Sequence, residues 1–316
     1  MSFSSKVKQE LSTQISGGRH CKIAELAAIL SLIGRIQISV GNQYMVKIHT
    51  ENIHVARKYF TLLKKTFNIR TDVSIRQGSY YTVAVRHHDD AMKLLKATRL
   101  MDANGEIGES MELMDKNILM QDCCKRAFIR GAFMAAGSIS DPEKFYHFEI
   151  VCSTMEKAEQ LCRIIQNFQI DAKIVERKKH FVVYIKEGSG IVDILNVMEA
   201  HIALMDLENV RIVKEMRNSV NRKVNCETAN LNKTVSAAVK QIEDIKYIRD
   251  TVGLEVLSPV LKDMAIVRLE NPETPLKELG TLLSPSVGKS GVNHRLRKIC
   301  EIAEDIRNNK EESYGN

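Results

Sequence analysis

The sequence predicts an α+β protein in which a duplicated αββαββα half is followed by an all-α half that contains a helix-turn-helix. Two observations predict the duplicated half. An apolar helix ending in glycine occurs twice, about a hundred residues apart, and each copy is followed by strand and helix patterns in the same order. A third observation predicts the all-α half, because the last third of the chain contains helical segments separated by proline-containing breaks.

The downstream apolar helix, Cys124 to Gly137, has one face made almost entirely of small residues. They recur at three- and four-residue spacing, as positions on one side of a helix do: Ala127, Gly131, Ala132 and Ala135. Glycine inside a helix costs roughly 1 kcal/mol relative to alanine, so Gly131 indicates close packing against another helix. Gly137 is expected to end the helix as a C′ glycine, with an extended segment after it.

The upstream helix, Cys21 to Gly34, has the same layout, with small residues at Ala24, Ala27 and Ala28. Two pairs of later segments also correspond: residues 67–76 with 168–177, and residues 80–85 with 181–186. A repeat of this length is too long for a solenoid unit and has about the size of a half-domain. We therefore expect the two small-faced helices to pack against each other on a pseudo-twofold axis.

Hydrophobic patterns predict the elements that follow each of these helices. In the first copy we expect strands Arg35–Val40 and Met45–Thr50 joined at Gly41-Asn42, helix Asn52–Asn68, a hairpin of Arg70–Arg76 and Tyr80–Arg86 about Gln77-Gly78-Ser79, and helix His88–Arg99. After a connection at residues 100–120, we expect strand Phe145–Cys152, helix Thr154–Phe168, a hairpin Ala172–Lys186 turning at Lys178-Lys179, and helix Ile191–Met198. The two repeats thus cover about residues 1–99 and 120–200.

The chain after the repeats is expected to be helical throughout. A basic helix covers Asp206–Lys223, a break follows at residues 223–228 with Thr228 as a cap, and a further helix covers Ala229–Tyr247. The apolar stripe of that helix should lie against a neighbour: Leu231, Val235, Ala238, Ile242 and Ile245. The expected domains are residues 1–222, including the connecting helix, and residues 223–316.

The last helices predict a helix-turn-helix over about residues 275–308. Ser258-Pro259 opens a helix to Leu269, and a short helix Leu276–Leu283 follows. Ser290 is expected to cap the last helix after a turn at residues 284–289. The buried stripe of that helix should contain Val292, Leu296, Ile299, Ala303 and Ile306. Two short helices joined by a turn, the second with a basic start, are typical of a helix-turn-helix.

The start of the last helix is a local basic patch on a neutral domain, since residues 223–316 hold fourteen Lys and Arg against fourteen Asp and Glu. In a helix-turn-helix these turns enter the major groove. Arg and Lys suit guanine edges or phosphates, Asn suits adenine, and a helix N-terminus suits phosphate. The candidate DNA contacts are Lys289, Ser290, Asn293, His294, Arg295, Arg297 and Lys298. The alternative is a helical hairpin that docks onto the protein with its cations in solvent.

Basic residues also decorate the two expected hairpins. An antiparallel sheet can leave one face exposed to solvent, so these residues are candidates for a concave sheet surface, or saddle, that binds DNA. The candidate saddle residues are Arg70, Arg76, Arg86, Lys173, Arg177, Lys178 and Lys179. The alternative is solubilising charge at turns and sheet edges, where lysine is common.

A glycine-terminated helix followed by two strands, a helix, two strands and a helix, twice over, resembles the LAGLIDADG homing-endonuclease fold. Within that group, one segment resembles the sequences of the WhiA family of bacterial sporulation-type transcription regulators: Cys123-Cys-Lys-Arg-Ala-Phe-Ile-Arg-Gly-Ala-Phe-Met-Ala-Ala-Gly-Ser138. Further segments extend the resemblance over nearly the whole chain: residues 146–150, 208–222, 224–235 and 289–298.

The resemblance implies a DNA-binding regulator of genes for sporulation or for cell division and chromosome segregation. Its partner would be promoter duplex DNA, with RNA polymerase or another regulator as a further candidate. LAGLIDADG nucleases place an acidic metal ligand directly before each terminal glycine, because Mg²⁺ prefers hard oxygen ligands. Those positions here are Ile33 and Ala136, and the nearest acids, Glu25 and Asp141, stand at other points. We therefore expect no enzyme activity, no catalytic residues, and no metal or cofactor.

The composition is that of an ordinary soluble globular protein, with 44% hydrophobic and 27% charged residues, and the net charge of +7 permits an anionic partner. Residues 1–11 predict a short amphipathic helix and no signal peptide, and no stretch approaches the ~18 apolar residues of a membrane span. Seven cysteines without Cys-x-x-Cys spacing predict reduced thiols and no zinc site, with Cys123 and Cys124 as a packed helix start. A cytoplasmic, nucleoid-associated protein without a membrane partner is expected.

Two other functions remain open from the sequence. The first is a divalent-metal DNA endonuclease that uses unrecognised acids, which nicking of supercoiled plasmid in Mg²⁺ or Mn²⁺ would reveal. The second is a protein-docking adaptor, in which the duplicated half binds a protein and not DNA. Truncation near residue 224 addresses the adaptor, since full DNA affinity of the C-terminal piece would exclude a role for the saddle.

Overall fold

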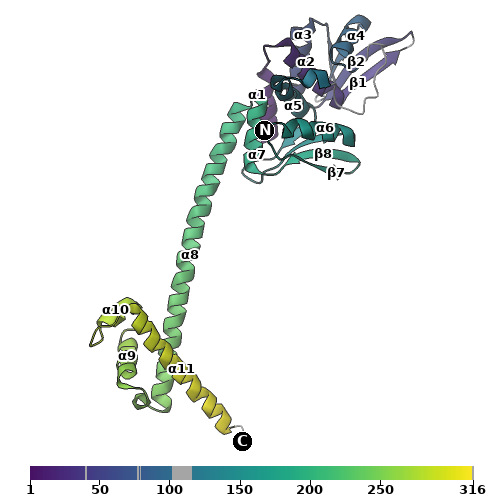
Figure 1. Ribbon diagram of the computed structural model, residues 1–316. Coiled ribbons are helices and arrows are strands. Elements are labelled where there is room, and N and C mark those ends of the chain that lie inside the picture. Colours follow the sequence, from purple (N-terminus) through teal and green to yellow (C-terminus); the bar gives the residue numbers. More distant parts are fainter. Residues whose placement is uncertain (40, 77, 79, 102–115, 315–316) are drawn as a thin grey trace. The chain divides into compact units, whose positions relative to one another are not determined.

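The computed structural model describes residues 1–39, 41–76, 78, 80–101 and 116–314 (Figure 1). The chain divides into two compact units, Met1–Glu215 and Met216–Asn316. The expected Val40, the turn residues Gln77 and Ser79, and most of the connection at 100–120 lie outside the described residues.

The first unit contains the two predicted αββαββα repeats, preceded by helix α1 (Phe3–Thr13). The first repeat consists of α2 (Arg19–Ile33), β1 (Gly34–Ser39), β2 (Gln43–Thr50), α3 (Ile53–Phe67), β3 (Asp72–Arg76), β4 (Tyr80–Val85) and α4 (His88–Ala97). A short 3₁₀ helix, η1 (Lys116–Leu119), leads to the second repeat. That repeat consists of α5 (Asp122–Ala136), β5 (Gly137–Ile139), β6 (Phe148–Cys152), α6 (Met155–Gln166), β7 (Lys173–Arg177), β8 (His180–Ile185) and α7 (Gly188–Met198).

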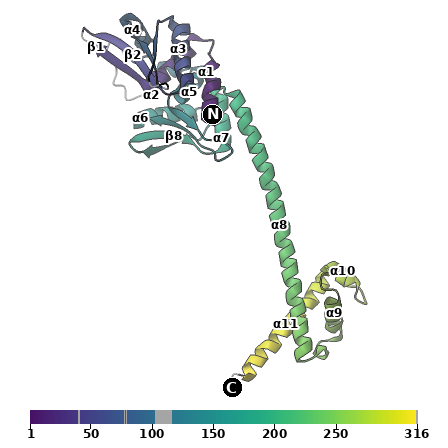
Figure 2. The same ribbon diagram turned by 180° about the vertical axis from the view of Figure 1, so that it is seen from behind.

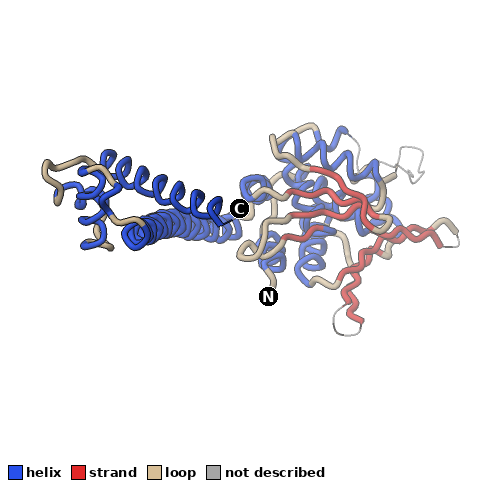
Figure 3. Tube along the Cα trace, turned by 90° about the horizontal axis from the view of Figure 1, so that it is seen from below, coloured by secondary structure: helices blue, strands red, loops and turns tan. Residues whose placement is uncertain are grey.

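The two sheets share one topology, which confirms the duplication. Their antiparallel strand orders are β1-β2-β4-β3 and β5-β6-β8-β7, so corresponding strands occupy corresponding places. Figure 3 shows the strands of both repeats in red with helices beside them. Helices α3 and α4 pack on the first sheet and α6 packs on the second. Each sheet therefore keeps one face for solvent or a ligand.

Helices α2 and α5 lie side by side at the centre of the first unit, as predicted (Figure 1; Figure 2 shows the same pair from behind). A Cβ added to Gly131 would stand 2.5 Å from the carbonyl oxygen of Glu25 and 3.0 Å from the Cβ of Ala28. Because any side chain at Gly131 would push the two backbones apart, the expectation that this glycine allows close packing is confirmed.

The glycines at the ends of α2 and α5 act differently from the C′ glycine that the sequence suggested. Gly34 and Gly137 have extended backbones (φ −69° and −91°, ψ 146° and 154°) and start strands β1 and β5 directly. A Cβ on Gly34 would overlap the carbonyl oxygen of Leu30, and one on Gly137 would overlap Phe133. These positions therefore need glycine because the chain folds back against the last helical turn, and not because of a positive φ.

Two turns form as expected, and the described residue of a third has the expected backbone. The β7–β8 hairpin turns at Lys178 and Lys179, whose φ values of 45° and 68° lie in the left-handed region. Left-handed residues at both central positions match the twist of a two-residue hairpin. Gly41 and Asn42 (φ 87° and 61°) turn the chain between β1 and β2, and Gly78 has a φ of 73°.

Two element starts in the second repeat were wrong. Strand β6 begins at Phe148 and not at Phe145, because the amides of Lys144 and Phe145 donate to the carbonyl of Asp141 in a turn (3.0 and 3.2 Å). Helix α7 begins at Gly188 and not at Ile191, since the amide of Ile191 donates to the carbonyl of Glu187 (3.0 Å).

The predicted break at residues 223–228 does not exist, and Thr228 is not a cap. Helix α8 runs without interruption from His201 to Thr251. Its sequence contains no glycine or proline, and Asn or Thr lowers helix stability by only a few tenths of a kcal/mol. The expected apolar stripe is also partly wrong, because Leu231 and Val235 are exposed.

The second unit has a small helical core. It contains the end of α8, the 3₁₀ helix η2 (Leu254–Val256), α9 (Pro259–Glu270), α10 (Leu276–Thr281) and α11 (Lys289–Tyr314). Its buried residues include Ile245, Ile248, Met264, Leu279, Val292, Leu296, Ile299 and Ala303. The predicted stripe of the last helix is thus buried, with Ile306 packed at its margin. No described helix has the length and apolar character needed to cross a bilayer.

Candidate nucleic-acid interface

The predicted helix-turn-helix is formed by α10 and α11. The turn between them folds back onto α10, where the amide of Val287 donates to the carbonyl of Gly280 (2.9 Å). A Cβ on Gly280 would overlap the carbonyl oxygen of Val287, so the close approach requires glycine. Helix α11 starts one residue before the expected cap: the carbonyl of Gly288 accepts from the amide of Val292 (3.1 Å), and Ser290 lies within the first turn.

The face of α11 opposite its buried stripe carries most of the predicted DNA contacts. The exposed members are Lys289, Ser290, Asn293, His294, Arg297 and Lys298, whereas Arg295 is half-buried. The first turn of α11 contains no acidic residue. Cations near a helix N-terminus oppose the helix dipole and cost a few tenths of a kcal/mol each. Their presence here therefore does not serve the stability of the helix.

Arg297 forms an ion pair with an acid on its own helix. Its Nε lies 3.3 Å from Oε1 of Glu301, one turn further along α11, and the two side chains are 78% and 58% exposed. Such solvent-screened pairs contribute about 0–1 kcal/mol. A phosphate or a base edge can consequently replace Glu301 as the partner of Arg297 at small cost.

The open face of the first sheet carries a group of cations. Strand register places Arg35 of the edge strand β1 beside Lys47 of β2, and Arg76 lies on the same face in β3, the opposite edge strand. His49 lies among them, and its Nδ1 is 2.8 Å from Oγ1 of Thr82. Burial lowers the pKa of His49, and the charges of Lys47, Arg35 and Arg76, which lie on the same face of the sheet, lower it further.

Arg35 and Lys47 were not among the predicted saddle residues, because those residues were taken from the two later hairpins, whereas Arg35 and Lys47 lie in β1 and β2. The signal was available, since alternate residues of a strand share a face and both residues alternate with apolar ones. Of the predicted residues in this repeat, Arg70 and Arg76 are exposed. Arg86 is paired through Nε with Oδ2 of Asp72 at 2.7 Å.

The corresponding face of the second sheet is nearly neutral. Nζ of Lys173 lies 3.1 Å from Asp171, and Nη1 of Arg177 lies 3.4 Å from Glu149. Register also places three valines across its centre: Val151, Val182 and Val175. Lys178 and Lys179 remain exposed at the hairpin turn. The two sheet faces thus share a topology but differ in charge.

The ends of α2 and α5 carry no metal-ligating side chain directly before the glycines. Ile33 and Ala136 are the last residues of these helices. Glu25 is fully buried and holds Nζ of Lys58 at 2.9 Å and Nε of Arg130 at 3.0 Å, so it is occupied within the core. Asp141 accepts from the amide of Glu143 at 3.1 Å.

The contacts of His147 give this residue a structural role in the second sheet. Its Nε2 lies 3.0 Å from Oε2 of Glu149, and its ring stacks on Tyr184. In the first repeat, Nδ1 of His88 accepts a hydrogen bond from the amide of Tyr44 (3.1 Å).

One group of side chains was missed altogether by sequence reasoning. His20, Cys21, Cys123 and Cys124 come from the two repeats, and their ligand atoms all lie within 4.8 Å of one another. No Cys-x-x-Cys spacing marks this group, because each repeat supplies two adjacent residues. The available signal was the correspondence of Cys21 with Cys124 in the aligned helices.

Together the fold and these surfaces define a class of protein: a duplicated LAGLIDADG-like scaffold followed by a helix-turn-helix domain. Three family models match the chain: the WhiA N-terminal LAGLIDADG-like domain at residues 19–101, the WhiA LAGLIDADG-like domain at residues 125–217, and the WhiA C-terminal HTH domain at residues 220–303. The chain belongs to the WhiA family.

Individual relatives match over nearly their whole length. The chain is 54% identical to the probable cell division protein WhiA of Lachnoclostridium phytofermentans, over 97% of this chain and 100% of the relative. It is 49% identical to the protein of the same name from Alkaliphilus oremlandii, over 98% of this chain and 99% of the relative. The crystal structure of full-length DUF199/WhiA from Thermatoga maritima has the same fold, with a TM-score of 0.60 at 24% identity, over 96% of this chain and 99% of that one.

Proposed function

We propose that this protein is a sequence-specific DNA-binding regulator of transcription that acts in cell division, with sporulation and chromosome segregation as related processes under its control. The observation that carries the proposal is the exposed, acid-free basic start of α11 in a helix-turn-helix. Membership of a family whose relatives are named probable cell division proteins supports the choice of process. The target is promoter duplex DNA, and the protein acts at the nucleoid.

The proposal divides the work between the two parts of the chain. Residues 223–316 read the site: Arg295, Arg297 and Lys298 contact guanine edges or phosphates, and Asn293 contacts adenine. Lys289 and Ser290 bind phosphate at the helix N-terminus, and His294 lies beside them on the exposed face. Residues 1–222 grip the duplex, or dock RNA polymerase or a partner regulator, without cutting DNA. Support for a non-cutting role comes from Ile33 and Ala136, which offer no metal ligand.

Replacing Arg297 by alanine should weaken binding to a bound promoter duplex by about 1–3 kcal/mol if this side chain contacts a base edge. Fluorescence anisotropy over a salt series measures this, with a duplex recovered by chromatin immunoprecipitation and a scrambled duplex of equal length. Wild-type affinity for the promoter duplex should fall steeply with salt, because bound cations replace counterions on the phosphates.

The matched control is Lys246→Ala, which removes an exposed cation from α8 in the same unit. It should leave the preference for the promoter duplex unchanged. Equal losses on the promoter and scrambled duplexes for Arg297→Ala would show that Arg297 does not read sequence. Salt-independent or absent binding by the wild type would refute the proposed function itself.

The charge difference between the two sheet faces gives a second prediction. For the double variant R35A/R76A, the slope of log K against log salt concentration should become about two less steep. The reason is that each lost phosphate contact removes about 0.9 from the magnitude of that slope. The matched variant K173A/R177A should change the slope less, since Asp171 and Glu149 already neutralise those cations. Unchanged slopes in both variants would exclude the sheets from DNA binding and favour a protein-docking role.

A further inference from the structure

Two adjacent pairs of side chains meet at the N-terminal ends of α2 and α5. His20 and Cys21 lie in the first turn of α2, and Cys123 and Cys124 lie in the first turn of α5. Cys21 and Cys124 each stand thirteen residues before the glycine that ends their helix. The pseudo-twofold relation therefore pairs His20 with Cys123 and Cys21 with Cys124. The group lies at the opposite end of the helix pair from Ile33 and Ala136.

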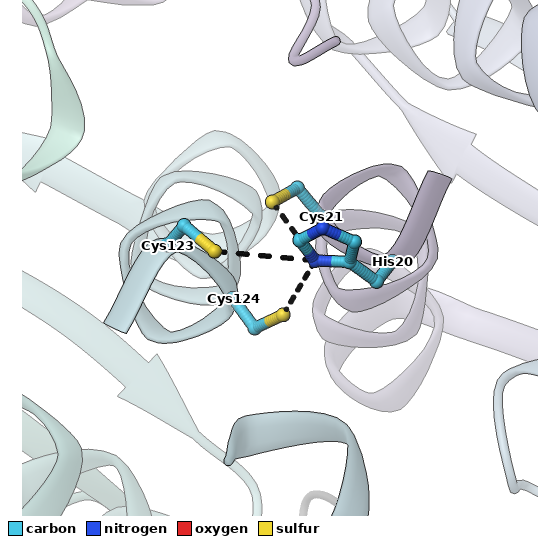
Figure 4. A group of neighbouring side chains, drawn as sticks. All are labelled: His20, Cys21, Cys123 and Cys124. Atoms are coloured by element: carbon cyan, nitrogen blue, oxygen red, sulfur yellow. Dashed lines mark hydrogen bonds between the residues drawn. The ribbon is translucent and has the colours of Figure 1, made fainter. Parts of the chain in front are cut away.

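The side chains converge on one point, as Figure 4 shows. Nδ1 of His20 lies 3.1 Å from Sγ of Cys124, 3.3 Å from Sγ of Cys21 and 3.9 Å from Sγ of Cys123. In a tetrahedral zinc site with Zn–S of about 2.3 Å and Zn–N of about 2.0–2.1 Å, neighbouring ligand atoms are roughly 3.5–3.8 Å apart. The observed separations bracket that range, and all four atoms lie within 4.8 Å of one another.

Hydrogen bonding alone does not account for this convergence. A single ring nitrogen accepts one hydrogen or donates one, yet three sulfur atoms surround Nδ1 of His20. Cys21 and Cys124 are also buried. A cation would convert them to thiolates and satisfy all four ligand atoms together.

We propose that His20, Cys21, Cys123 and Cys124 bind one thiolate-preferring divalent cation of the zinc class, which fastens the first repeat to the second. One imidazole and three thiolates form a closed four-ligand set, which is typical of structural sites and leaves no position for a substrate. Binding by the reduced protein releases three protons from the three thiols and changes no oxidation state. The two helix N-termini at the site favour the resulting negative charge. The proposal is independent of DNA binding.

Cobalt(II) titration of the reduced, chelator-treated full chain tests the site. Co²⁺ should produce intense visible d–d bands of tetrahedral thiolate coordination that saturate at one equivalent, and Zn²⁺ should abolish them. The protein as isolated should also contain about one zinc per chain by mass spectrometry. Chelation should lower its melting temperature.

Variants locate the ligands. His20→Ala and Cys123→Ser change exposed residues, so the fold should survive, as far-UV circular dichroism will show, while the bands weaken or shift. Cys124→Ser should abolish tight cobalt binding. The control Cys226→Ser removes an exposed cysteine from α8 and should leave the spectrum unchanged.

Two results would overturn the proposal. One is a spectrum without tetrahedral bands in excess Co²⁺ from protein in which all seven thiols titrate as free. The other is a count two thiols short under denaturing conditions, together with peptide mapping that places the disulfide between two cysteines of this group. Neither result bears on DNA affinity, which the anisotropy experiment measures separately.

Discussion

Replacing Arg130 by methionine is expected to lower the free energy of unfolding of the first unit by about 3–5 kcal/mol, which is the usual cost of removing one partner of a buried ion pair. Arg130 is 1% exposed. Its Nε donates to Glu25 (3.0 Å), Nη1 to Glu199 (2.7 Å), and Nη2 to Oγ of Ser16 (2.7 Å). Methionine fills a similar volume, so the loss reports the charge and its hydrogen bonds more than a cavity.

The expected loss is large because Arg130 holds several segments to one buried carboxylate. Glu25 also pairs with Lys58, whose Nζ donates to the carbonyls of Leu11 in the last turn of α1 and of Gln14 at the end of that helix. Burial opposes the charge on Arg130, but the Glu25 and Glu199 carboxylates outweigh it and raise the pKa of Arg130. The guanidinium therefore stays charged, and its removal leaves the buried Glu25 with one cation in place of two.

Urea unfolding followed by circular dichroism measures the effect, with Arg177→Met as the matched control. Arg177 is also an arginine in an ion pair, but its side chain is 59% exposed. The control should cost no more than about 1 kcal/mol. Equal losses in the two variants would contradict the assignment of Arg130 as the centre of the buried network.

The duplication could be predicted from the sequence because its signals are local. Hydrophobic periods, two glycine-terminated helices and turn residues such as Lys178-Lys179 each depend on a few neighbouring positions. Gly131 even predicted a long-range contact, since a glycine inside an apolar helix lowers helix stability unless it lets another backbone come close. These features gave the element order, the sheet repeats and the α2–α5 contact.

What the sequence did not reveal depends on contacts between distant segments or on weak local preferences. The pairing of Glu25 with Lys58 and Arg130 joins residues from three helices, and no spacing rule connects them. The His20 and cysteine group is likewise divided between repeats. The continuity of α8 through residues 223–228 was missed because Asn and Thr are common at helix ends, although neither residue stops a helix.

At the DNA interface, the basic start of α11 could be predicted because cations, turn and helix are close in sequence. The charge difference between the sheets could not, since it depends on which carboxylates stand beside which cations. Lys173 and Arg177 look like free cations in the sequence, whereas the fold places Asp171 and Glu149 next to them. Arg35 and Lys47 required the strand register before they could be assigned to a common face.

The variant R295A/R297A/K298A is expected to lose sequence recognition while it keeps its fold and part of its non-specific affinity. Three contacts worth about 1–3 kcal/mol each amount to a loss of at least about 3 kcal/mol, or a factor above roughly 100 in affinity for the specific site. The core of the second unit should survive, because Val292, Leu296, Ile299 and Ala303 carry the packing of α11. Circular dichroism melting checks that expectation, in particular for the half-buried Arg295.

Selection from a random duplex library with the full chain is the most direct measurement of whether α11 chooses the site. The wild type should enrich one motif over successive rounds, and the folded triple variant should enrich none while it still retains duplex at low salt. Enrichment of the same motif by both proteins would contradict the account, because recognition would then lie outside the start of α11.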